Sequence, residues 1–319
     1  MIDPDLIGQF GPDFTFPVER GANRKFAVAA HGPWSGYMED EAAPMHPAFL
    51  STANVLWGYS LERPRGSVFE GIDHDLSVPL HAEEAYQFPG RLPHVGETLT
   101  ARACLESVTE KHGSRGGDLT FLVMLTEFHD TAGTLVAQAR ATTVTTRNAP
   151  DGDGNLGSAP PPYKPRYDSL EPPDPFNAIA RQEWGALAVD KGPASVSTGD
   201  LTLHDMVRFQ AACGEDNPLH YDLAHAQQAG FPGMFGLGMH QASALASYAV
   251  RWLGEENARS FHARFRNVFW VGDPLTYSGR VVALREENGR KLADLELVCT
   301  RDSDQAVIVQ LWMSFDLTN

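Results

Sequence analysis

The sequence predicts an α+β protein made of two copies of one unit, in which a helix precedes several antiparallel strands. Residues 95–100 (VGETLT) and 271–276 (VGDPLT) match, and each enters a strand pattern after a turn with Gly and an acidic residue. The same order of elements surrounds both segments, and a stretch rich in Pro and Gly separates them. We therefore predict an internal duplication: an N-terminal repeat over residues 1–148, a linker over 149–176 and a C-terminal repeat over 177–319.

The N-terminal repeat combines one predicted helix with a β-rich run. Residues 1–30 show no clear hydrophobic period and predict no definite element. Apolar side chains at three- and four-residue steps, Phe49 and Ala53 among them, predict a helix over residues 44–61. Strand patterns follow over residues 76–88, from 95 onward, over 119–126 and, after a turn signal at 130–133, over 135–146.

The C-terminal repeat begins with a helix whose start is marked by Thr202 and Asp205, a variant of the capping box. This helix is expected to end near residue 212. A second helix fits residues 238–253, where Ala and Ser keep one face narrow enough to lie close against a sheet. Strands are expected over residues 260–270, 274–285, 291–300 and 305–316.

Composition excludes several classes of protein. The formal net charge of −16 disfavours binding to nucleic acid or to an anionic membrane surface. No apolar run reaches the roughly 18–20 residues of a membrane-spanning helix, and the N-terminus lacks the pattern of a signal peptide. Three widely spaced cysteines indicate neither a disulfide framework nor a zinc site. We expect a cytoplasmic protein with no metal and no nucleotide or redox cofactor.

The densest group of titratable residues lies between the two helices of the C-terminal repeat. Residues 213–222 (CGEDNPLHYD) hold three carboxylates, an amide and an imidazole. Pro218 restricts the backbone and Gly214 loosens it. A loop crowded with such groups and held between packed elements is a plausible place for acid–base chemistry.

This loop and the residues after it resemble the MaoC-like family of (R)-specific enoyl-CoA hydratases and 3-hydroxyacyl-CoA dehydratases. The family pattern is Gly-Asp-x-Asn-Pro-Leu/Ile-His-x-Asp, then a downstream Ala and Gly, then His-Gly-Met; residues 214–222, Ala226, Gly230 and Gly238-Met239 fit it. The likeness covers residues 195–316 well, and the N-terminal half looks like the degenerate repeat of the family. The resemblance implies a double hot-dog fold: two repeats of a long helix wrapped by an antiparallel sheet, which form a pseudo-dimer within one chain. A homodimer of two such chains is a further expectation.

The resemblance also implies a set of catalytic residues. In the family an Asp and a His activate a water that adds to a 2-enoyl thioester, and a backbone N–H at the Gly of His-Gly-Met receives the thioester oxygen. Here the His is His220 and the Gly is Gly238. Two positions depart from the family: Glu215 stands where the Asp is expected, and Leu237 stands where the His before Gly is expected.

Other residues are assigned smaller roles around this set. We expect Asp216, Asn217 and Met239 to lie near the substrate; Asp216 is the second candidate for the base, and Asn217 ties the loop. The nearest candidates for the CoA phosphates are Arg264 and Arg266, with Arg280. Cys213 is expected to be a small buried side chain, and His46, His81 and His240 are expected to be structural or surface residues. The N-terminal repeat has Pro44-Met45-His46-Pro47 in place of the catalytic neighbourhood, so we expect it to lack catalysis and to shape an acyl-binding cavity with Phe49, Trp57 and Tyr59.

The predicted function is that of a hydro-lyase, which reversibly hydrates a 2-enoyl-CoA or a related acyl thioester to the 3-hydroxyacyl thioester. Its partner is acyl-CoA or an acyl-carrier thioester. Two alternatives stay open. The departures at Glu215 and Leu237 would also suit a non-catalytic acyl-thioester-binding protein or subunit, and a hot-dog thioesterase would release free thiol.

Overall fold

The computed structural model describes residues 4–53, 80–112, 118–146, 159–161 and 174–318. The strands are β1 (Phe14–Pro17), β2 (Leu80–Gln87), β3 (Thr98–His112), β4 (Asp118–His129), β5 (Leu135–Thr146), β6 (Val196–Asp200), β7 (Ala258–Phe265), β8 (Pro274–Glu287), β9 (Arg290–Arg301) and β10 (Val307–Asp316). The α-helices are α1 (Arg20–Ala29), α3 (Leu203–Cys213), α4 (Leu223–Gln228) and α5 (Gly238–Leu253). Single turns are η1 (Pro4–Leu6), η2 (Ser35–Glu39), η4 (Trp184–Ala186), η5 (Pro218–His220) and η6 (Glu255–Asn257).

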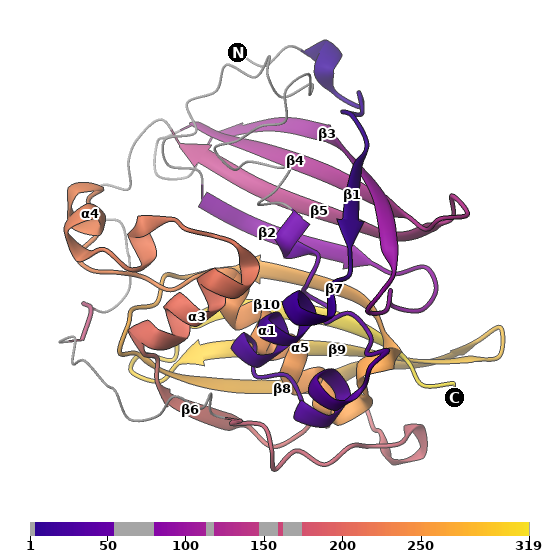
Figure 1. Cartoon of the computed structure of the whole chain (residues 1–319). Helices are drawn as coiled ribbons and strands as arrows, with labels where there is room; N and C mark the ends of the chain where they lie inside the picture. Colours follow the sequence, from indigo (N-terminus) through magenta and orange to yellow (C-terminus); the bar gives the residue numbers. More distant parts are fainter. Residues whose placement is uncertain (1–3, 54–79, 113–117, 147–158, 162–173, 319) are drawn as a thin grey trace.

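All ten of these strands join one antiparallel sheet, whose order is symmetric about its centre. The order is β1-β3-β4-β5-β2-β7-β10-β9-β8-β6, so each strand of the N-terminal repeat has a counterpart in the C-terminal repeat. The two halves meet where β2 pairs with β7 and Ala85 lies opposite His262. Figure 1 shows the magenta half of the sheet on one side of this seam and the orange and yellow half on the other, with α1 and α3 side by side near the seam.

The turn that opens each long strand is built in the same way in both repeats. Gly96 and Gly272 take positive φ angles of 92° and 96°, a region that favours Gly. The N–H of Gly96 donates to the carbonyl of Val18 at 2.9 Å, and the N–H of Gly272 donates to the carbonyl of Leu201 at 2.7 Å. This matched geometry agrees with the predicted duplication.

The C-terminal repeat wraps its sheet around α5, which contacts β7, β9 and β10. The predicted bounds of this helix are confirmed, and Ala242, Ala246 and Ala249 on it are fully buried. Small side chains allow the helix axis to approach the sheet closely. The capping box is also confirmed: the hydroxyl of Thr202 accepts from the N–H of Asp205, and the Asp205 carboxylate accepts from the N–H of Thr202.

Several boundaries differ from the sequence predictions. The strand expected over residues 260–270 ends at Phe265, because the backbone then leaves the ladder and the N–H of Trp270 turns to the carboxylate of Asp273 (2.8 Å). The sequence predicted neither β1 nor α1, since β1 has four residues and α1 carries Gly, Asn and Arg without a clear period. Of the helix expected over 44–61, only residues 51–53 are helical: Pro44 forms an isolated bridge with His94, and residues 47–50 form turns. The rest of that segment lies outside the described residues, as do residues 76–79.

Among the described residues, no helix is long and apolar enough to cross a membrane.

Histidines are buried where the two repeats meet. His46 is fully buried and its Nε2 lies 3.0 Å from the hydroxyl of Ser247 on α5. His240 stacks on the ring of Phe209 at 4.8 Å. Burial lowers the pKa of His46 to about 3 and lowers that of His240 as well, because an imidazolium loses its hydration there. Both rings are therefore neutral near pH 7.

We expect His46 to make the fold sensitive to acid. In the unfolded chain His46 takes up a proton near pH 6.5, whereas the folded chain keeps it neutral down to about pH 3. Its contribution to stability is thus present above pH 6.5 and is lost as the pH falls, by about 1.4 kcal/mol per pH unit. Between pH 7 and pH 5, the free energy of unfolding measured with urea should fall by about 2 kcal/mol less in His46→Gln than in the wild type.

The control is His112→Gln, at an exposed position. Equal pH dependence of unfolding in wild type and His46→Gln would contradict the prediction.

Candidate active site

The loop between α3 and α4 is held in place by its own polar groups. Gly214 ends α3 in the left-handed region, with φ of 80°, and its N–H donates to the carbonyl of Gln210 at 2.8 Å. The side chain of Gln210 donates to the carbonyl of Asn217 at 3.1 Å. The Asn217 side chain accepts from the N–H of Leu219 at 3.1 Å and caps η5, which begins at Pro218. Asn217 therefore ties the loop, as expected.

His220 is buried at the end of η5, with 7% of its surface exposed. Its Nδ1 lies 2.8 Å from the carbonyl oxygen of Phe235. A carbonyl only accepts, so Nδ1 must carry the hydrogen. Burial lowers the pKa of His220 to about 4, so the ring is neutral near pH 7 and its Nε2 is an unprotonated acceptor. The fold thus selects the tautomer with a basic Nε2.

Glu215 faces that nitrogen. Its Oε1 lies 3.9 Å from Nε2 of His220, and its side chain is about one-third exposed. Burial raises the pKa of Glu215 above its ordinary value. The positive field of His81 and a hydrogen bond from the N–H of Asn217 act against that rise, and the charge of Asp216 adds to it. The structure therefore brings together the two side chains that the sequence paired.

Gly238 is the first residue of α5, so its N–H belongs to the helix end that has no carbonyl one turn earlier. Leu237, at the N-cap, makes no side-chain hydrogen bond to this end. The ring of Phe265 lies so close that a Cβ at Gly238 would collide with it. Phe235, which holds His220, precedes Gly238 by three residues. The helix end carries a partial positive charge that suits a developing oxyanion.

The other predicted residues lie around this set in different ways. Met239 is buried in the core behind Gly238, and Asp216 is exposed. Arg264 pairs with Glu83 (2.7 Å) and its guanidinium lies over the ring of Trp312, whereas the next residue, Phe265, turns inward to Gly238. Successive strand residues face opposite sides, so the structure does not bring Arg264 together with Glu215 and His220.

Three more side chains complete that comparison. Arg266 is exposed and donates to the side chain of Gln310 at 3.0 Å. Cys213 is buried, and burial raises the pKa of its thiol to about 12, as expected of a small core residue. Arg280 pairs with Asp190 and Glu296.

The N-terminal repeat has an equivalent position with different chemistry. In the C-terminal repeat the N–H of Gly236 donates to the carbonyl of Phe269 at 2.8 Å. The equivalent hydrogen bond in the N-terminal repeat runs from the N–H of Met45 to the carbonyl of Pro93 at 2.7 Å. Two residues further on, Gly238 therefore corresponds to Pro47. Proline has no N–H, so this repeat cannot offer the donor that Gly238 offers.

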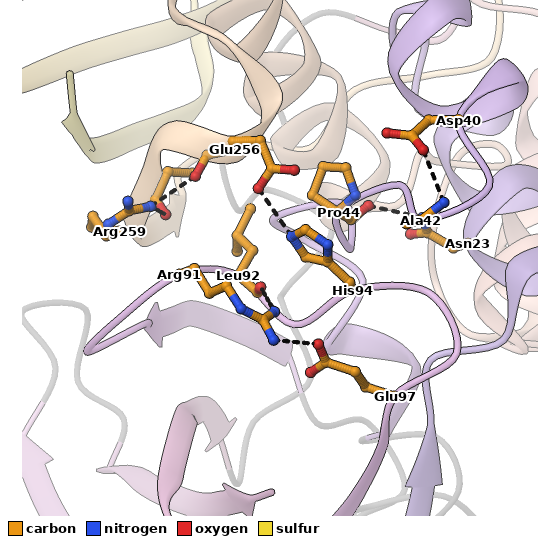
Figure 2. Close-up of polar contacts among 11 residues, drawn as sticks. Asn23, Asp40, Ala42, Pro44, Arg91, Leu92, His94, Glu97, Glu256 and Arg259 are labelled. Carbon is orange, nitrogen blue, oxygen red and sulfur yellow. Dashed lines mark hydrogen bonds and ion pairs between the residues drawn. The ribbon is translucent and has the colours of Figure 1, made fainter. Parts of the chain in front are cut away.

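Figure 2 shows this part of the N-terminal repeat and its contact with the other repeat. Asn23 donates to the carbonyl of Pro44 at 3.1 Å, and Nε2 of His94 meets the carboxylate of Glu256 at 3.0 Å. Asn23 is fully buried, and its side chain also accepts from the N–H of His46 at 2.9 Å. The approach to Pro47 is thus held by structural hydrogen bonds.

Sequence reasoning missed one polar residue near the site. His81 is a surface residue, as expected, but its ring also lies 4.7 Å from that of Phe265 and its electrostatic interaction lowers the pKa of Glu215. His81 lies on β2 in the other repeat, so only the pairing of β2 with β7 could have revealed it. In the part of the chain that the structure describes, no three His, Cys, Asp or Glu side chains are grouped so as to hold a metal ion.

The fold and the loop define a double hot-dog protein of the hydratase and dehydratase class. The model of the FAS1-like dehydratase domain region matches residues 5–139, and that of the MaoC-like domain matches residues 186–299. The chain belongs to the MaoC-like family in its two-domain form.

Individual relatives agree with this placement. The chain is 28% identical over 284 residues to the enoyl-CoA hydratase ChsH3 of Mycobacterium tuberculosis, covering 82% of this chain and 84% of that protein. A solved MaoC-like dehydratase has a TM-score of 0.73 at 18% identity, over 97% of this chain and 98% of the other. A MaoC-like dehydratase from Phytophthora capsici has a TM-score of 0.65 at 16% identity, over 98% of each chain.

One further solved structure names the fold directly. A Mycobacterium tuberculosis protein described as having a double hot-dog fold has a TM-score of 0.60 at 12% identity, over 96% of each chain. The predicted double hot-dog fold is therefore confirmed.

Proposed function

We propose that the chain reversibly hydrates a 2-enoyl thioester to the 3-hydroxyacyl thioester, with Glu215 and His220 acting on water and Gly238 on the thioester oxygen. The observation that carries the proposal is the pair of acceptors, Nε2 of His220 and Oε1 of Glu215, 3.9 Å apart. A water with hydrogen bonds of about 2.8 Å reaches both atoms. Because both are acceptors, the water donates both hydrogens and directs its lone pairs away from the pair, toward a substrate.

The proton of the water passes to Glu215. Burial raises the pKa of Glu215 and lowers that of His220 to about 4, so the carboxylate is the stronger base of the two. The water oxygen bonds to C3 of the substrate, and the C2=C3 electron pair moves into an enolate whose oxygen accepts from the N–H of Gly238. Glu215 then returns the proton to C2. The reverse steps dehydrate a 3-hydroxyacyl thioester.

The Glu in place of the family Asp fits this chemistry. Its raised pKa brings the carboxyl closer to neutral pH, where a group both takes up and returns a proton efficiently. Leu237 in place of the family His costs little, because the donor at Gly238 is a backbone group.

Substrate and setting extend the proposal. We take acyl-CoA as the substrate, as the name of the similar enoyl-CoA hydratase suggests, with an acyl-carrier thioester as the other source of the same group. The buried, unpaired cysteines fit a reducing cytoplasm. A homodimer of two chains stays a prediction.

To test this proposal, the purified protein is incubated with crotonyl-CoA and with longer or branched 2-enoyl-CoA thioesters. We expect the ultraviolet absorbance of the conjugated thioester to fall as water adds, and the 3-hydroxyacyl product to appear by chromatography. Binding of acyl-CoA without turnover of any substrate would favour the non-catalytic binding protein, which the departures at Glu215 and Leu237 motivate. Release of free thiol would instead identify a thioesterase.

A further inference from the structure

The Glu215 site borders the N-terminal repeat along the seam between β2 and β7. On β7, Phe265 reaches the start of α5 at Gly238. On β2, the ring of His81 lies 4.7 Å from the ring of Phe265. His81 therefore reaches the same end of α5 from the opposite repeat.

A buried carboxylate holds His81 in this place. Nε2 of His81 lies 2.8 Å from Oε2 of Glu84, whose side chain is fully buried. The register of β2 against β5 shifts between His81 and Glu83. Such a bulge redirects a side chain and is common beside active sites. Glu84 thus fixes both the orientation of the ring and the nitrogen that donates.

The internal symmetry shows that this polar pair is specific to one side of the molecule. Ala85 and His262 lie opposite each other at the centre of the seam, so the counterpart of Glu84 is Phe261 and that of His81 is Ala258. The bulges agree, since the register of β10 against β7 shifts at Phe315, opposite Ala258. The C-terminal repeat, whose β7 faces Pro47, thus carries the apolar residues Ala258 and Phe261. At the equivalent positions the N-terminal repeat, whose β2 faces Glu215, carries His81 and Glu84.

We propose that His81, held by Glu84, is a positioning residue of the Glu215 site and is contributed by the N-terminal repeat. The expected effect of His81 on the rate rests on the proposed function, whereas its expected effect on the pKa of Glu215 does not. The charged and titratable groups that face Glu215 are His220 from η5, Asp216 beside it, Cys213 from α3 and His81 from β2. The charge of Asp216 raises the pKa of Glu215, and the interaction with His81 lowers it.

The chain offers a matched control on the outer face of the same strands. Nε2 of His262 lies 2.9 Å from Oε2 of Glu83, which repeats the chemistry of the His81–Glu84 pair without proximity to Gly238. A general effect of losing one such pair at the seam will appear in both variants. An effect on Glu215 will appear only with His81.

The first experiment follows protonation of Glu215 by infrared difference spectroscopy, with the Glu215→Gln variant identifying its band. In His81→Gln we expect the midpoint to rise by about one pH unit, a tenfold change in the proton affinity of the carboxylate. In His81→Lys, which places a cation at this position, the midpoint should return toward the wild-type value, and in His262→Gln it should not move. An unchanged midpoint in His81→Gln, or an equal rise in His262→Gln, would overturn the inference.

The second experiment measures hydration of a 2-enoyl-CoA by the same variants. We expect His81→Gln to shift the acid limb of the kcat–pH profile upward by about one pH unit, so that kcat on that limb falls about tenfold, and to leave KM within about twofold. His81→Lys should partly restore the limb. An unchanged acid limb in His81→Gln alongside an active wild type would refute the positioning role and leave the proposed function standing. If the wild type hydrates no substrate, the proposed function fails, and the infrared titration still tests whether His81 alters the pKa of Glu215.

Discussion

Replacing His220 with Gln is expected to lower kcat for hydration of a 2-enoyl-CoA by about a thousandfold. The Gln amide can still donate to the carbonyl of Phe235, which His220 does at 2.8 Å, so the loop keeps its anchor. The amide does not place an acceptor where Nε2 of His220 holds the attacking water, and positioning of a reactant can contribute well over about 10³ in rate. Initial rates over a range of substrate concentrations, with circular dichroism for the fold, will measure the effect.

The control for this variant is His225→Gln, which lies on the exposed side of α4 a few residues away. It should hydrate the substrate at the wild-type rate. If His220→Gln keeps more than about a tenth of wild-type kcat while it remains folded, His220 does not position the attacking water.

Shortening Glu215 to Asp is expected to lower kcat about a hundredfold, although Asp is the residue of the family pattern. The change withdraws the carboxylate by one methylene from a position 3.9 Å from Nε2 of His220. A misplacement of about 1 Å in an active site can cost this much. Burial and charge stay similar, so the fold and the affinity for acyl-CoA should change little. Steady-state kinetics and binding of a saturated acyl-CoA separate these effects.

Asp216→Asn is the matched control, because Asp216 is adjacent but exposed, and its activity should stay close to wild type. Faster turnover in Glu215→Asp would show that the extra methylene hinders the site. Full activity in Glu215→Ala, together with loss of activity in Asp216→Ala, would assign the base to Asp216 instead.

The fold was predictable where the chain carries a local signal. The Ala- and Ser-lined segment predicted α5 at its observed bounds, Gly238–Leu253, and the pair Thr202 and Asp205 marked the start of α3. The short strand β1 and the weakly periodic α1 carry no such signal, since their contacts with β3 and α3 hold them in place. Tertiary contacts of this kind are invisible in a local pattern.

The candidate site divides in the same way. Glu215, His220 and Asn217 share one loop, so spacing alone indicated a crowded group of polar side chains, and the family pattern selected Glu215 over Asp216. Gly238 required the family pattern, because nothing local distinguishes a donor from a packing glycine. His81 reaches the site only through the pairing of β2 with β7, and the ion pair of Arg264 with Glu83 depends on the same register.

Pro47 has a consequence for stoichiometry. Because it replaces the N–H that Gly238 offers, the two hot-dog units of one chain share a single centre instead of forming two equivalent ones. The proposed activity thus has one turnover site per polypeptide, and a homodimer would have two sites among four units. The unit without a centre is free to diverge: substitutions around Pro47 would reshape the acyl-binding cavity that the sequence predicts without altering the groups proposed to act on water.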